Sequence, residues 1–367
     1  MTKYPVREIR FEELAAELTP ESFVEPMVCA VLRDGVRYEF LIKRIPGSRQ
    51  AVVFGTGHLT ISREEWPFFS RQSWMNEIPC NCIYYFDPTL YLGPIELAWC
   101  YGTNARWYLR EIADILELLL KAMDVPADSA LMMGSSGGGF TSIMLAAMLR
   151  ARCMAINPQT DFRRYLEAPV EKLRQTVLVP GEDWIDERAD AAALMKREGF
   201  VPYVHIYQNV IVERDLKDHI IPFVLKLQKL GEDCGYSKIR LDFYQHPDGH
   251  NAMPMKKLCI TAMLQDLEAA CLDTISPNDY RKAPVSAAYS VSGRDLTVKL
   301  DPGSGTEGVR EYAYYLYRKK QVVTKIGYSR ETEHVFPDLE PGDYHVKYFI
   351  RTAEEKQSYS MPVQRIR

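Results

Sequence analysis

Short apolar runs separated by turn-forming residues fill the first part of the chain and predict strands. Residues 25–45, "EPMVCAVLRDGVRYEFLIKRI", indicate two strands around Asp34-Gly35, because an Asp-Gly pair between alternating apolar residues is a hairpin signal. "QAVVFGTG" (50–57) and "CNCIYYFDP" (80–88) predict two more strands, each rich in β-branched or aromatic residues and ended by Gly or Pro. We expect the hairpin to add antiparallel strands at one edge of a sheet.

Helical and strand-like segments then alternate up to about residue 275. Residues 104–125 have helical periodicity, with apolar residues at positions 109, 112, 115, 116, 119 and 120. The later pattern predicts strands within 129–134, 153–161, 201–208 and 238–246, and helices within 137–151, 220–231 and 255–272. This alternation indicates a doubly wound, mostly parallel sheet with helices on both faces.

The pattern changes character beyond Pro277. Apolar and polar residues alternate there in short runs separated by Gly, Pro and Asp, which is typical of a small all-β sandwich. We therefore expect an α/β domain over residues 1–276, a linker over 277–284, and a β-sandwich that resembles immunoglobulin or fibronectin modules over 285–367.

Composition and charge exclude several classes of function. Apolar residues make up 47% and charged residues 26%, which is ordinary for a globular protein, and the net charge of −4 provides no basic field for nucleic acid. No run of apolar residues is long enough to span a membrane, and the charged N-terminus lacks the apolar region of a signal peptide, so we expect a cytoplasmic location.

The eight cysteines lie mostly in apolar segments, which predicts buried thiols in a reducing compartment. Cys80 and Cys82 form a C-x-C pair, but no second Cys/His pair at ligand spacing accompanies it. We therefore expect neither a metal site nor a cofactor.

The stretch "GSSGGGF" (134–140) carries the strongest chemical signal. Gly134-x-Ser136-x-Gly138 matches the G-x-S-x-G nucleophile elbow, in which a serine lies on a tight turn between a strand and a helix. A buried strand is predicted before it and a helix after it, as the motif requires. The glycines are not followed by Lys and lack G-x-G-x-x-G spacing, which excludes a phosphate-binding loop.

A nucleophilic serine needs a histidine base and an acid, which follow it in the order Ser, acid, His in folds with this elbow. Among the seven histidines, His250 is the best candidate, because it follows a predicted strand and precedes the last helix of the domain; His246 is its rival. The acid is expected in the loop after the strand 201–208. Asp215 is preferred because it leaves room for a loop before a helix near His219, whereas Asp218 is the alternative acid or a helix N-cap.

Two backbone amides should stabilise the oxyanion that forms on acyl transfer. The first is expected from Gly137, at the helix N-terminus directly after the serine. The second is expected from Gly55 or Thr56, where the strand "AVVF" ends in a glycine-containing loop.

The predicted strands and helices, together with the candidate site residues, resemble the α/β-hydrolase superfamily across positions 25–275. The ordered segments "AWCYGT" (98–103), "GSSGGGF" (134–140), "INPQTD" (156–161) and "YQN...D...H..PF" (207–223) also look similar to hydrolase-like proteins of bacterial capsular polysaccharide loci. A more distant resemblance links them to acetyltransferase-like accessory secretion proteins. The chain departs from the family pattern in its longer segment "NVIVERDLKDH" (209–219), where the acid should lie.

The resemblance implies a serine esterase or O-acyltransferase that acts on a carbohydrate or a polysaccharide precursor through an acyl-enzyme. The implied partners are an acyl-sugar substrate and an acyl donor such as acetyl-CoA, and the C-terminal module is a candidate surface for a protein partner or self-association. An alternative is a non-catalytic scaffold protein of a polysaccharide locus, built on a degenerate hydrolase fold. A peptidase of the same fold ranks last.

Overall fold

The computed structural model describes residues 4–23, 25–60, 62–234, 237–268, 286–301, 310–319, 321–352 and 356–366. The chain divides into two compact units, residues 1–277 and 278–367. The predicted linker, residues 277–284, lies outside the described residues.

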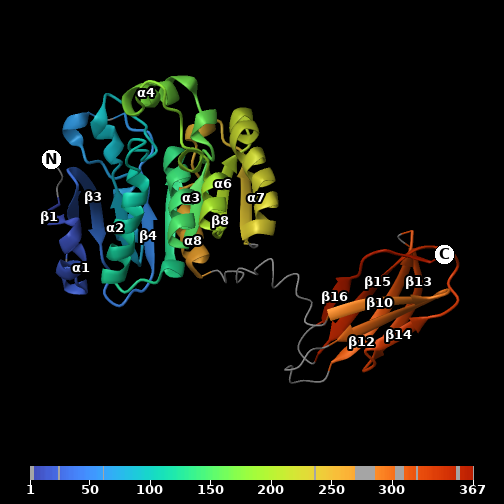
Figure 1. Ribbon diagram of the computed structural model, residues 1–367. Helices are drawn as coiled ribbons and strands as arrows, with labels where there is room; N and C mark the ends of the chain where they lie inside the picture. Colours follow the sequence, from blue (N-terminus) through green and yellow to red (C-terminus); the bar gives the residue numbers. More distant parts are fainter. Residues whose placement is uncertain are drawn as a thin grey trace. The chain divides into compact units, whose positions relative to one another are not determined.

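A nine-stranded sheet forms the centre of the N-terminal unit in the described part of the chain (Figure 1). Its order is β1-β2-β3-β5-β4-β6-β7-β8-β9, and every neighbouring pair is parallel except β2 with β3 and β3 with β5. The strands are β1 (Val6–Arg10), β2 (Met27–Arg33), β3 (Val36–Lys43), β4 (Ala51–Phe54), β5 (Asn81–Tyr85), β6 (Ala130–Ser135), β7 (Arg152–Ile156), β8 (Val204–Asn209) and β9 (Ile239–Tyr244).

Helices cover this sheet, and α2, α3, α6 and α7 stand side by side along it (Figure 1). Helix α8 also packs against β6 and β7. The helices are α1 (Leu14–Glu17), α2 (Tyr108–Ala122), α3 (Gly137–Leu149), α4 (Glu167–Val177), α5 (Asp186–Ala189), α6 (Ala191–Glu198), α7 (Ile221–Cys234) and α8 (Lys256–Glu268).

The hydrophobic pattern explains the main elements. All six apolar positions expected on one face of α2 are buried, and α3 is buried from Gly137 to Ala147 because it packs on β6 and β7 and contacts α2 and α6. The predicted hairpin is present, with Asp34 and Gly35 both at positive φ between β2 and β3. Strand β1 was not expected; it extends the sheet beyond the hairpin and pairs in parallel with β2.

Three further features match the family expectation. The sheet is mainly parallel, its antiparallel strands lie toward one edge, and a glycine-flanked serine joins β6 to α3. The N-terminal unit therefore has an α/β-hydrolase-like fold. Such folds place ligands at the carboxyl ends of the parallel strands, so a ligand is expected beside the residues that follow β4, β6, β7, β8 and β9.

The C-terminal unit is all-β in its described residues. It has a sheet of order β10-β11-β14 and a second of order β13-β12-β15-β16, with β17 also paired to β15, and its pairings are antiparallel. Residues of both sheets, among them Leu296, Val298, Leu316 and Val346, share one apolar core. The strands are β10 (Ser286–Ser292), β11 (Asp295–Asp301), β12 (Glu311–Arg318), β13 (Gln321–Ser329), β14 (Glu333–Phe336), β15 (Gly342–Arg351), β16 (Lys356–Ser360) and β17 (Gln364–Ile366).

Within the described residues, none of the helices combines the length and apolar character needed to cross a bilayer.

Candidate active site

Ser136 lies between the end of β6 and the start of α3 in a strained backbone conformation. Its φ of 55° and ψ of −123° belong to a region that residues with a side chain rarely occupy. The Ser136 amide donates to the Ile156 carbonyl at 3.0 Å, and its own carbonyl accepts from the Phe140 amide at 3.1 Å. These bonds tie the turn to β7 and to the first turn of α3, so the hydroxyl is held at the strand's carboxyl end.

The glycines around Ser136 are required by close packing. A Cβ on Gly134 would lie 2.2 Å from the carbonyl oxygen of Gly138, and one on Gly138 would lie 3.0 Å from the carbonyl oxygen of Gly55. A Cβ on Gly137 would meet the side chain of Leu97 at 2.6 Å. The strand, the helix and the loop after β4 approach one another only because these positions have no side chain.

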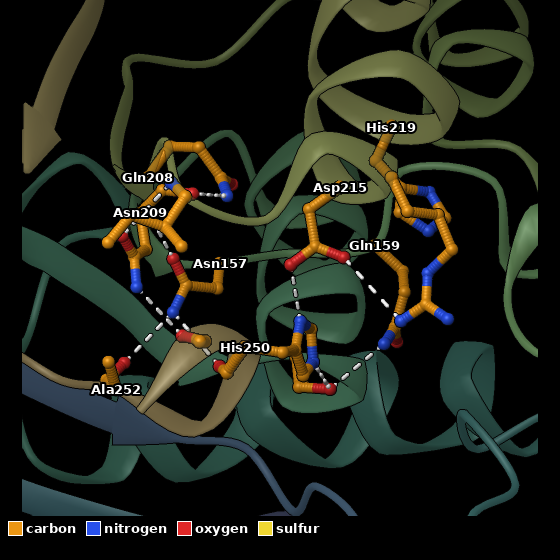
Figure 2. Close-up of polar contacts among 12 residues, drawn as sticks. Asn157, Gln159, Gln208, Asn209, Asp215, His219, His250 and Ala252 are labelled. Atoms are coloured by element: carbon orange, nitrogen blue, oxygen red, sulfur yellow. Dashed lines mark hydrogen bonds and ion pairs between the residues drawn. The ribbon is translucent and has the colours of Figure 1, made fainter. Parts of the chain in front are cut away.

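His250 brings its ring between Ser136 and Asp215. Its Nε2 lies 2.8 Å from Ser136 Oγ, and its Nδ1 lies 2.5 Å from Asp215 Oδ2. Figure 2 shows the ring of His250 directed toward the carboxylate of Asp215. Asp215 is fully buried, whereas 15% of the His250 side chain is exposed. The preferred serine, histidine and aspartate thus form one hydrogen-bonded line.

The surroundings of Asp215 differ from the expected loop. Asp215–Ile220 form a π-helical turn that continues directly into α7, and the Ile221 amide bonds back to the Leu216 carbonyl. The expectation of a loop before a helix near His219 was wrong, because the helical path already includes Asp215. Asp218 accordingly lies inside this turn and is not an N-cap.

The other histidines of this unit have different environments. His246 has a 45% exposed side chain, and its Nδ1 accepts from the Asp248 amide. His58 pairs with Glu96 at 3.3 Å. His205 lies within β8, is fully buried, and lies 2.6 Å from Asp266 and 3.1 Å from Asp242. Only His250 reaches Ser136 among the histidines of the described residues.

Sequence reasoning did not find Gln159, a fully buried side chain that contacts the serine. Its Nε2 donates to Ser136 Oγ at 2.9 Å, and its Oε1 accepts from the indole N–H of Trp99 at 2.8 Å. Trp99 and Cys100 both have positive φ, which turns the loop 98–103 so that the indole meets Gln159. The quoted segments 98–103 and 156–161 therefore meet at the nucleophile.

Two buried asparagines hold the loop that carries His250. Asn157 Nδ2 lies 3.0 Å from the carbonyl oxygen of His250 and 2.9 Å from that of Ala252. Asn209 Nδ2 donates to the carbonyls of His246 and Gly249, at 2.8 and 2.9 Å. Figure 2 shows both asparagines on one side of His250, opposite Asp215 and Gln159. The loop is thus fixed from the ends of β7 and β8.

The two expected oxyanion donors behave differently. Gly137 is the first residue of α3, so its amide belongs to the first turn, where N–H groups have no partner within the helix. The amide of Gly55 donates to the Met133 carbonyl at 2.9 Å, so it is engaged in the sheet and is not free for an oxyanion. Thr56 is buried, and its hydroxyl donates to the Tyr85 carbonyl. Gly57, the next residue, lines the cavity beside Ser136.

A cavity of about 750 Å³ opens above Ser136 and His250. Its lining is mixed: apolar groups such as Phe68 and Leu166 occur beside polar ones such as Thr60, Arg71 and Asn251.

His219, close to Asp215 in the sequence, does not line this cavity. Burial lowers the pKa of His219 to about 4, against the opposing effect of Asp215, so the His219 imidazole is neutral at physiological pH.

No group of three or more His, Cys, Asp or Glu side chains in the described part of the chain is arranged to hold a metal ion. Cys80 and Cys82 are free and buried, and burial raises the pKa of Cys80 to about 11 and that of Cys82 to about 12. Both are therefore thiols at neutral pH, the form that binds metals poorly.

No family model matches the chain, and a search of the curated proteins found no match. Solved structures that are similar to it include a capsule O-acetyltransferase of Neisseria meningitidis serogroup A, with 15% identity over 60% of this chain and 89% of that chain and a TM-score of 0.44. An S-formylglutathione hydrolase from Agrobacterium tumefaciens has 14% identity over 66% of this chain and 94% of that chain, with a TM-score of 0.45. The Glycosylation Associate Protein (Gap123) complex from Streptococcus agalactiae has 13% identity over 64% and 44%, with a TM-score of 0.45. Similarity at this level says nothing of substrate or mechanism, so the chemistry rests on this chain's own geometry.

Proposed function

We propose that the N-terminal unit is a serine-dependent esterase or O-acyltransferase that acts on a carbohydrate ester. The observation that carries the proposal is the continuous line of hydrogen bonds from Asp215 through His250 to Ser136, which ends at an open cavity. A serine in a strained turn, a histidine that reaches its hydroxyl and a buried acid that orients the ring are the parts of a nucleophilic acyl-transfer site.

In the proposed reaction Ser136 Oγ attacks the ester carbonyl while His250 Nε2 accepts the hydroxyl proton. Asp215 accepts the Nδ1–H bond and stabilises the imidazolium that forms. The amide of Gly137, with a second amide from the loop at residues 56–57, would bind the oxyanion. The imidazolium then protonates the leaving alkoxide, and an acyl-enzyme remains. Water as the second nucleophile completes an esterase cycle, and a sugar hydroxyl completes a transferase cycle.

The carbohydrate assignment rests on two features of this chain. One is the motif resemblance to hydrolase-like proteins of capsular polysaccharide loci. The other is the polar side of the cavity, where hydroxyl, amide and guanidinium groups can bond to a hydroxyl-rich ligand. The immunoglobulin-like character of the C-terminal unit, and its role toward a protein partner or a second copy, stay predictions.

The test is labelling of the purified full chain with a fluorophosphonate, with the labelled residue identified by mass spectrometry. We expect Ser136 to be labelled in wild type, and labelling to be lost in Ser136→Ala and His250→Ala. Asp215→Asn should slow it strongly, because the ring of His250 loses the acceptor that orients it. Asp218→Asn is the matched control and should label at the wild-type rate. A folded wild type that stays unlabelled would reject the hydrolase mechanism and favour the scaffold alternative.

Acyl-donor experiments separate the two enzymatic cycles. Wild type is incubated with acetyl-CoA, with and without an acceptor sugar. Acetyl-Ser136 that disappears only when the sugar is added would identify a transferase, and loss in water alone would identify an esterase.

A further inference from the structure

We propose that Arg71 is an anion-binding residue of this cavity. The alcohol part of the natural substrate, which gives up or receives the acyl group, then carries a carboxylate or a phosphate. The inference rests on the proposed function of the same site and names its substrate class as an acidic sugar.

The position of Arg71 is the first observation. It lines the cavity together with Ser135, Ser136, His250 and Met253. Its Nη2 donates to Ser135 Oγ at 2.7 Å and lies 3.1 Å from the sulfur of Met253. Ser135 occupies the variable position of the elbow, so the guanidinium is bonded to the residue that precedes Ser136 and lines the same cavity.

The lack of a counter-charge is the second observation. Among the described residues, no carboxylate forms an ion pair with Arg71, although most other arginines of this unit have one. Its Nε is buried and has no hydrogen-bond partner within the described part of the chain. The two acceptors that its Nη2 contacts, a hydroxyl and a thioether, are neutral.

The protonation state and the backbone conformation of Arg71 agree with a role in anion binding. Burial lowers its pKa to about 10, so the side chain is still charged at neutral pH. Arg71 also has a φ of 64°, a left-handed conformation unusual for a residue with a long side chain. Its guanidinium lies 5.6 Å from the ring of Trp74, which supports its plane from one side.

A partly buried cation without a counter-charge is costly, and this cost is reduced when an anion binds it. A guanidinium matches the planar geometry of a carboxylate or the oxygens of a phosphate through paired N–H donors. Because Ser135 precedes the nucleophile, an anion on Arg71 would hold the adjoining part of the substrate near Ser136. A neutral sugar ester would leave this charge uncompensated.

The first experiment measures wild-type selectivity with matched ester pairs. One pair is an O-acetylated methyl glucuronoside and the corresponding glucoside, which differ by a carboxylate on the alcohol. The other pair is p-nitrophenyl hemisuccinate and p-nitrophenyl propionate, which differ by a carboxylate on the acyl group. We expect kcat/KM to favour the acidic sugar by at least about tenfold, as a charge-assisted hydrogen bond would give, with no comparable preference in the second pair. A preference confined to the acyl side, or none in either pair, overturns the proposal.

Variants then connect the selectivity to Arg71. In Arg71→Gln we expect the glucuronoside-to-glucoside ratio to fall to near one, and in Arg71→Lys to retain part of it. Arg49→Gln is the matched control, because Arg49 is exposed and far from the residues that line the cavity, and should keep the wild-type ratio. A ratio that survives in a folded Arg71→Gln overturns the assignment even if Ser136 still labels.

A binding measurement separates this proposal from the proposed function. Methyl glucuronoside and inorganic phosphate are titrated into Ser136→Ala, which cannot form an acyl-enzyme, and binding is followed by calorimetry. Binding that is lost in Ser136→Ala/Arg71→Gln supports the anion site whether or not any ester is turned over. No binding, or equal binding in both proteins, overturns it.

Discussion

At the scale of single residues, Gln159 shows how much of the site depends on buried polar contacts. Its amide joins Trp99 to Ser136, so it positions the hydroxyl that His250 would deprotonate in the proposed reaction. Gln159→Leu removes the donor to Oγ and leaves the indole N–H of Trp99 without its acceptor. We expect kcat/KM to fall by roughly 10- to 100-fold, which corresponds to the usual cost of 1–3 kcal/mol for such a loss. Steady-state kinetics with an ester and the rate of fluorophosphonate labelling measure it.

Trp99→Phe is a milder change to the same contact, and its effect is compared with that of Gln159→Leu. It keeps the amide of Gln159 but removes the indole donor that fixes its orientation, so a smaller loss is expected. An unchanged labelling rate in Gln159→Leu would show that Ser136 needs no donor from this side chain.

His219 makes stability depend on acid pH. Its pKa is lowered from 6.5 to about 4 in the folded state because it is buried, so between these values the unfolded chain binds a proton that the folded chain does not. The free energy of unfolding should therefore decrease as pH falls from 6.5 to 4, by about 3 kcal/mol in total from this group. His219→Gln should flatten this slope in urea titrations at several pH values. Parallel slopes for the two proteins would contradict the assignment.

The serine and histidine of the proposed triad were easier to choose from the sequence than the side chains that contact them. Ser136 and His250 follow from local patterns, a glycine-flanked serine and a histidine in the loop before the last helix. Asp215 was preferred over Asp218 because of an expected loop that is absent; in the structure, the π-helical turn decides which carboxylate faces the ring. Arg71 and Gln159 had no local signal, since each acts through contacts with segments distant in the sequence.

At the scale of elements, the ends of β7 and β8 act together on the His250 loop. Asn209→Ala removes donors to the carbonyls of His246 and Gly249, and we expect the ring of His250 to lose its fixed distance to Ser136. The labelling rate should fall by about tenfold or more, from the loss of two buried hydrogen bonds. Because this role is indirect, the apparent pKa in the pH profile of labelling should also move.

Asn104→Ala is the control for this change, since Asn104 is partly exposed and its side chain bonds to the Asp183 carbonyl and the Tyr101 hydroxyl, away from the His250 loop. If Asn209→Ala labels at the wild-type rate with an unchanged pH profile, the asparagine has only a structural role.

Elements with a strong apolar pattern were predictable, and those with weak patterns were not. The hairpin and α2 follow from their periodicity, and the central strands β4, β5 and β6 follow from short continuous apolar runs that are buried at nearly every position. Helix α4 buries only Leu173 and Val177, and α6 is a short alanine-rich segment, so residues 162–200 carried no clear helical signal. The π-helical turn at Asp215 was also missed, because the periodicity of apolar residues does not distinguish a widened turn from a loop.

At the scale of the molecule, each unit has its own apolar core, so a mutation that destabilises one unit should not change the reactivity of the other. Leu316 is fully buried in the C-terminal core. Leu316→Ala should destabilise that unit by about 2–5 kcal/mol, from lost burial and the cavity left behind. Calorimetry should show one transition moved to lower temperature, and fluorophosphonate labelling of Ser136 should keep its wild-type rate. A matching loss of labelling would show that the units depend on each other.

The backbone of Ser136 also bears on how this gene can change over generations. A residue with a side chain in that conformation costs about 1–3 kcal/mol, whereas glycine occupies it with little penalty. A mutation from serine to glycine at this codon would thus give the folded protein extra stability and remove its proposed nucleophile in one step. A lineage with no need for acyl transfer would accept that change readily, so the retention of serine at 136 in descendants reports continued selection for chemistry.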